Sequence, residues 1–94
     1  MQFAIAAFLK PGAEGELQKY SDDFNEHLGP SGTNVVLAGV LRDEGGKRVG
    51  YLAFYDGNDI ADAKAWVHES PIYKAQLYDR LEVYHYQVEV GRLG

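Results

Sequence analysis

Residues 34–55 read NVVLAGVLRDEGGKRVGYLAFY and carry the clearest structural signal in the chain. Both ends of this stretch, residues 34–41 and 48–55, are rich in the β-branched and aromatic side chains that favour β-strands. The linker between them, residues 42–47, is polar and contains the pair Gly45-Gly46. Two strand-like runs joined by a short glycine-containing linker predict a β-hairpin.

Two helices are predicted outside this hairpin. The first covers residues 13–28, because apolar side chains recur there at steps of three and four, at Leu17, Tyr20, Phe24 and Leu28. The second begins at Asn58-Asp59, which is typical of a helix start, and breaks at Ser70-Pro71. Ser70 caps a further helical piece, with Pro71 at its first position, that runs to about Tyr78.

Apolar runs at residues 2–9 and 81–90 predict a first and a last strand. Glycine- and proline-containing turns, including Gly29-Pro30-Ser31-Gly32, separate the segments. The order is therefore strand, helix, strand, strand, helix, strand. Two helices on one face of a four-stranded antiparallel sheet make a ferredoxin-like α+β sandwich, which we expect residues 1–94 to form as a single domain.

Both faces of the predicted sheet are apolar. In each strand, apolar residues occupy both the odd and the even positions. In the first strand, one face carries Phe3, Ile5, Ala7 and Leu9 and the other carries Ala4, Ala6 and Phe8. In the hairpin, one face of each strand carries Val35, Leu37 and Leu41 or Tyr51, Ala53 and Tyr55, and the other carries Val36, Ala38 and Val40 or Leu52 and Phe54. Two helices cover only one face. Large exposed apolar patches usually mark interfaces, so the second face predicts a homodimer. The alternative is that small side chains such as Ala4 and Ala38 tolerate partial exposure.

Composition narrows the class of protein. Nine Lys and Arg against fourteen Asp and Glu give a net charge of −5, which argues against binding a nucleic-acid backbone. The chain has no cysteine, so a disulfide framework or a zinc-thiolate site is impossible. The N-terminal apolar run is too short to span a bilayer and no basic segment precedes it, so we expect a cytoplasmic protein that does not bind membranes.

Several motifs resemble the YciI-like (YCII-related) family. They are Ala38-Gly39-Val40-Leu41, Asp43-Glu44-Gly45-Gly46, Val49-Gly50-Tyr51-Leu52, Ala63-Lys64-Ala65-Trp66-Val67, the run from Ser70 to Tyr78, and Glu82-Val83. Together they cover most of residues 34–90. This resemblance implies membership of the dimeric α/β-barrel superfamily, whose ferredoxin-like protomers would pair through the second sheet face.

The resemblance also implies an active site, made of a histidine late in the first helix and an aspartate before the proline that follows the second. His27 matches the histidine, Ser70 stands at the aspartate position, and Phe24 replaces an arginine often found one turn before the histidine. His27 and Ser70 are therefore the candidate catalytic residues, with Pro71 and Tyr73 as candidate ligand-binding residues. By residue type alone, His27 is more commonly a dipole partner at a helix end, and Ser-Pro at a helix start is explained by Ser70 as a helix cap.

The expected function is that of a small YciI-like homodimer with a pocket for a small organic molecule, acting as a hydrolase, lyase or isomerase through a histidine. The alternative is a non-catalytic ligand-binding or regulatory dimer that has lost the family aspartate. No cofactor is expected. The three histidines lack metal-binding spacing and no acidic cluster joins them, so no metal is expected either.

Overall fold

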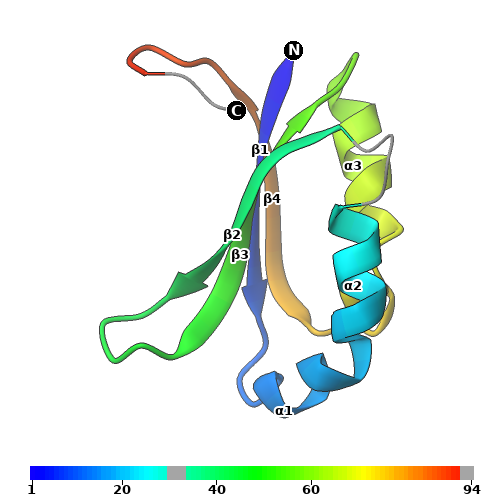
Figure 1. The fold of residues 1–94 in the computed structure, drawn as a ribbon, viewed down its shortest axis with the longest axis vertical. Helices are drawn as coiled ribbons and strands as arrows, with labels where there is room; N and C mark the ends of the chain where they lie inside the picture. The colour runs from blue at the N-terminus through cyan, green and yellow to red at the C-terminus, as the bar shows by residue number, and fades with distance from the viewer. Residues whose placement is uncertain (30–33, 92–94) are drawn as a thin grey trace.

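Four antiparallel strands form one sheet in the order β2-β3-β1-β4 (Figure 1). The computed structural model describes residues 1–29 and 34–91, so most of the predicted turn at residues 29–32 lies outside the described residues. The strands are β1 (Gln2–Leu9), β2 (Val35–Arg42), β3 (Arg48–Asp56) and β4 (Tyr78–Tyr86). This is the order of a ferredoxin-like sandwich, so the predicted fold class and the predicted hairpin are confirmed.

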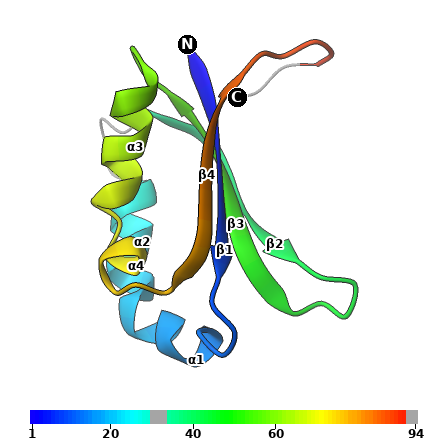
Figure 2. The ribbon, with the colours of Figure 1, turned by 180° about the vertical axis from the view of Figure 1, so that it is seen from behind.

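All the helical segments lie on one side of this sheet (Figures 1 and 2). They are α1 (Glu14–Leu17), the 3₁₀ turn η1 (Gln18–Tyr20), α2 (Ser21–Leu28), α3 (Ile60–His68) and α4 (Pro71–Lys74). The single helix predicted over residues 13–28 is thus broken in its middle. Tyr20 leaves helical geometry at φ −115° and ψ 5°, and the Ser21 hydroxyl donates to the Gln18 carbonyl. Serine commonly competes with helical backbone bonds in this way.

The second helical region begins and breaks where the sequence predicts. The Asp59 side chain accepts a hydrogen bond from the backbone N–H of Asp62 at the start of α3. The Ser70 hydroxyl accepts one from Ile72 at the start of α4. These caps satisfy N–H groups that have no partner inside the helix.

α4 ends earlier than predicted because Gln76 adopts a positive φ of 60°. The N–H of Leu77 donates to the carbonyl of Ile72, and that of Gln76 to the carbonyl of Tyr73. This pair of bonds is a Schellman motif, which turns the chain out of the helix. As a result β4 starts at Tyr78 rather than at residue 81, and it ends at Tyr86 rather than at residue 90.

The core lies between the helices and the sheet. One cluster of buried side chains sits beneath α3 and comprises Phe3, Ile5, Ala53, Ala63 and Val67. A second cluster, of Leu17, Phe24 and Ile72, joins α1, α2 and α4. Tyr51 packs against both clusters, so it stands at the junction between them.

The opposite surface of the sheet is mainly apolar, as predicted, although the pairing of β4 with β1 also places Arg80 and Glu82 on it. Strand pairing places on this outer face Ala4, Ala6, Phe8, Leu37, Leu52, Phe54, Tyr84 and Tyr86. Leu37 and Tyr84 are more than half exposed there, at 51% and 56%. One predicted detail is wrong: strict alternation puts Val35 and Leu37 on the same face, but a register shift pairs Val35 with Tyr55 and Leu37 with Phe54. A bulge inserts one residue and so reverses the alternation.

Candidate functional site

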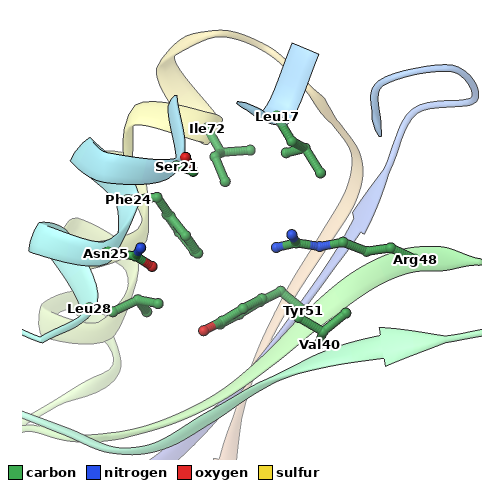
Figure 3. A pocket seen from close by; sticks show the side chains of 9 residues that line it. All are labelled: Leu17, Ser21, Phe24, Asn25, Leu28, Val40, Arg48, Tyr51 and Ile72. Carbon is green, nitrogen blue, oxygen red and sulfur yellow. The ribbon is translucent and has the colours of Figure 1, made fainter. Parts of the chain in front are cut away.

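A cavity of about 170 Å³ opens between α2 and the strands β2 and β3 (Figure 3). Its lining residues are Leu17, Ser21, Phe24, Asn25, Leu28, Val40, Arg48, Tyr51 and Ile72. The helices contribute mainly apolar side chains, whereas β3 contributes the guanidinium of Arg48 and the phenol of Tyr51. Apolar walls with a few converging polar groups are typical of a small-molecule site.

Arg48 is the strongest charge in this cavity. Its side chain points into the space beside Phe24 and Tyr51 (Figure 3), and its Cζ atom lies 6.0 Å from the centre of the Tyr51 ring. Its Nε is buried and makes no hydrogen bond to any described residue. No carboxylate within residues 1–29 and 34–91 forms an ion pair with it. The guanidinium of Arg48 can therefore donate a hydrogen bond to a ligand in the cavity.

A much smaller chamber of about 10 Å³ lies behind the cavity and shares Phe24 and Tyr51 with it. Ser70 and Tyr78 bring hydroxyl groups to this chamber. Burial raises the pKa of Tyr78 to about 12, while a hydrogen bond from Ser70 and the charge of Arg48 partly oppose the rise. Burial likewise raises the pKa of Tyr51, against the influence of Arg48. Both phenols therefore keep their protons at neutral pH.

His27 lies at the end of α2 and is engaged with α3. Its Nε2–H donates to the carbonyl oxygen of Trp66 over 2.8 Å, and the two rings are stacked with their centres 4.6 Å apart. The same histidine borders an open hollow on the surface, together with Pro71 and the charged side chains of Asp23, Glu26, Glu69 and Lys74. The structure thus brings His27 and Pro71 to one hollow.

Ser70 and Tyr73 occupy different surroundings. Ser70 is 2% exposed and faces the inner chamber, and no hydrogen bond between described residues joins it to His27. Tyr73 is 38% exposed, stacks on His68, and borders another hollow near Lys10 and the start of β4. The four residues singled out in the sequence therefore line three separate spaces.

Arg48 and Tyr51 were not predicted as site residues. Strict alternation would put these two residues, three apart in the chain, on opposite faces of β3. The pairing between β2 and β3 shifts after Leu41, so that Val49 is an extra residue. This bulge turns Arg48 to the helix side, where Tyr51 already points. The isolated Gly50 beside Val49 is the signal in the sequence that could have located this bulge, because a glycine inside a strand often marks one.

Within the described part of the chain, no group of three or more His, Asp or Glu side chains is arranged to hold a metal ion. The same residues include no helix that is long and apolar enough to cross a membrane.

Comparison with known proteins identifies the fold. No protein-family model and no curated protein matches the sequence. Among solved structures, 5-chloro-2-hydroxyhydroquinone dehydrochlorinase (TftG) from Burkholderia phenoliruptrix AC1100, in complex with 2,5-dihydroxybenzoquinone, superposes with a TM-score of 0.82 at 16% identity, over 93% of this chain and 94% of that one.

Two proteins from Mycobacterium tuberculosis also superpose. The heme-degrading protein Rv3592 has a TM-score of 0.58 at 18% identity, covering 97% of this chain and 100% of its own. Rv0793 has a TM-score of 0.56 at 14% identity, with 96% and 97% covered. At these identities the likeness establishes the fold alone, which is the ferredoxin-like protomer of the dimeric α/β-barrel proteins.

Proposed function

We propose that this protein is a cytoplasmic, YciI-like homodimer, a single domain over residues 1–94, that binds a small organic molecule in the cavity between α2 and β3. The observation that carries the proposal is the cavity itself, in which the guanidinium of Arg48 faces apolar walls and has a buried Nε with no hydrogen-bond partner among the described residues. TftG, which shares the fold, is described in complex with the one-ring compound 2,5-dihydroxybenzoquinone, and this supports a ligand of similar size.

The homodimer is part of this proposal because the outer face of the sheet is left uncovered by the helices. Phe54 and Tyr86 form an edge-to-face pair on it, with ring centres 4.8 Å apart, and the guanidinium of Arg80 lies 4.2 Å from the ring centre of Phe8. A second copy of the chain presents the same surface, so a twofold axis would bury both together. Burial of an apolar surface of this kind would stabilise the dimer.

We propose in addition that His27 and Ser70 take part in a hydrolase, lyase or isomerase reaction, with Pro71 and Tyr73 contacting parts of the ligand that extend out of the cavity into the hollows that these two residues line. Ser70 supports this reading, because it lines the small chamber that shares Phe24 and Tyr51 with the cavity. The alternative, a binding dimer without catalysis, is supported by the bonds that already occupy the two side chains. The Nε2–H of His27 is held by Trp66, and the Ser70 oxygen caps α4.

The binding proposal is tested by the thermal stability of the protein with 2,5-dihydroxybenzoquinone, small carboxylates and lactones. A ligand present at 100 times its Kd adds about 2.7 kcal/mol to the free energy of unfolding. The Val40→Trp variant should lose this protection, because Val40 lines the cavity and is 40% exposed, so the larger ring can fill the opening. Lys64→Trp on the exposed surface of α3 is the matched control. Protection that persists in Val40→Trp would place the ligand elsewhere.

Catalysis is tested on whichever compound binds. Ser70→Asp restores the family carboxylate and keeps the cap of α4, because aspartate caps helices as well as serine does. If His27 and position 70 form an incomplete catalytic pair, Ser70→Asp should turn the compound over faster than the wild type. Adding His27→Gln to Ser70→Asp should abolish this gain. Recovery of the compound unchanged from all three proteins would leave the non-catalytic dimer as the function.

A further inference from the structure

We propose that the ligand of this cavity is a small planar organic anion, whose negatively charged oxygen is bound by Arg48. This inference rests on the function proposed above and names the chemical class of the ligand. It identifies Arg48 as the residue that selects for charge.

The charge of Arg48 is not balanced within the described residues of the cavity. An arginine side chain is positively charged at any ordinary pH, and a partly buried charge without a partner is costly. Arg48 has a buried Nε without a hydrogen bond, and no carboxylate of the described residues pairs with it. A carboxylate, phenolate or enolate oxygen would supply both the missing charge and the missing acceptor.

The polar side chains beside Arg48 are neutral, and those of Tyr51 and Asn25 can donate hydrogen bonds. Tyr51 lies in the same cavity, and burial keeps its proton in place, so its hydroxyl can donate to an anion. Asn25 adds a side-chain amide on the side of α2, whereas the hydroxyl of Ser21 already donates to the Gln18 carbonyl. Asp and Glu are absent from this lining, so nothing in it would repel a negative ligand or favour a cation.

The cavity has the size and shape for a single planar ring. An apolar cavity of about 150 Å³ holds one benzene molecule, and the present cavity has a volume of about 170 Å³. The rings of Phe24 and Tyr51 meet at an angle of 83°, with their centres 5.1 Å apart, and form two flat walls (Figure 3). A single conjugated ring fits against such walls while its charged substituent reaches Arg48.

The test compares benzoate with benzamide, two probes of the same shape that differ in charge. Binding is measured by calorimetry, and the Nε–H resonance of Arg48 is followed in ¹H–¹⁵N NMR spectra. Hydrogen bonds to charged groups contribute enough for benzoate to bind the wild type at least about 10-fold more tightly than benzamide. Benzoate should also shift the Nε–H resonance, and benzamide should shift it much less.

Arg48→Met should abolish the preference for benzoate and leave benzamide binding almost unchanged. Arg42→Met is the matched control, because the guanidinium of Arg42 is bonded to the Gly46 carbonyl outside the cavity, and it should keep the wild-type preference. If Arg48→Met does not fold, the preference and the Nε–H shift of the wild type decide the question.

Two negative results are distinguishable. Equal binding of both probes, or a preference that survives in Arg48→Met, overturns the assignment of an anion and leaves the cavity as a binding site. If neither probe shifts the resonances of the lining residues, the cavity is not a binding site, and the proposed function falls together with this inference.

Discussion

The imidazole of His27 closes the end of α3 by donating its Nε2–H to the carbonyl oxygen of Trp66. The last carbonyl groups of a helix lack partners within it. Here the N–H of Glu69 reaches the carbonyl of Ala65 and that of Ser70 reaches the carbonyl of Val67, so the intervening carbonyl of Trp66 is available to His27. A candidate catalytic residue thus also joins α2 to α3.

We expect His27→Ala to destabilise the protein by about 1–3 kcal/mol, because it removes both a hydrogen bond and a stacked ring. His27→Phe, which keeps a ring for stacking, should cost about 1 kcal/mol. Urea denaturation measures both values. His68→Ala is the control, because His68 is exposed and stacks only on the exposed Tyr73. An Ala variant as stable as the wild type would show that the bond to Trp66 contributes nothing.

The outer face predicts the oligomeric state. The wild type should sediment as a dimer at micromolar concentration, and Leu37→Asp should sediment as a monomer because an unpaired carboxylate is costly to bury at an interface. Leu37 is 51% exposed in the protomer, so the monomer should remain folded. Lys64→Glu, on the helix side, should stay dimeric. A wild type that is monomeric at high concentration in the ultracentrifuge would rule out this interface.

Because Tyr78 is buried, we expect the protein to lose stability at alkaline pH. An exposed phenol titrates near pH 10, whereas burial raises the pKa of Tyr78 to about 12. As the pH rises, the unfolded chain therefore releases this proton before the folded protein does. The contribution of Tyr78 to the free energy of unfolding is complete below about pH 10 and is lost as the pH rises to about 12. The loss amounts to about 3 kcal/mol.

Urea denaturation at intervals from about pH 9 to about pH 12 measures this loss. Tyr78→Phe should show a shallower decline, leaving the smaller contribution of Tyr51, whose pKa is also raised. Tyr84→Phe, at a position 56% exposed, should retain the wild-type slope. Parallel slopes in the wild type and Tyr78→Phe would contradict the burial of this phenol.

Gln76 offers a stabilising substitution. Its φ of 60° is costly for a residue with a side chain and natural for glycine at the end of a Schellman motif. Gln76→Gly should therefore raise the free energy of unfolding by about 0.5–1 kcal/mol, measured by urea denaturation. Gln76→Ala keeps the Cβ atom and should bring no such gain. If Gln76→Gly is less stable than the wild type, the side chain of Gln76 stabilises the protein by more than its positive φ destabilises it.

The order of elements, the hairpin, the two caps and the apolar outer face were all predicted from the sequence. Each of these features depends on residues close together in the chain. Asp59 caps α3 through Asp62, and Ser70 caps α4 through Ile72. The continuous apolar run of β1 is likewise visible in the seven consecutive residues 3–9. Such signals act over one helical turn or a few strand residues, so they can be read without knowing the fold.

The tertiary structure decided which side chains meet. The bulge at Val49 depends on how β3 pairs with β2, and it alone brings Arg48 to the cavity beside Tyr51. The bond between His27 and Trp66 joins residues 39 positions apart and depends on where α2 ends against α3. Strand register and helix docking are set by the packing of the whole core, and a shift of one residue exchanges the two faces of a strand.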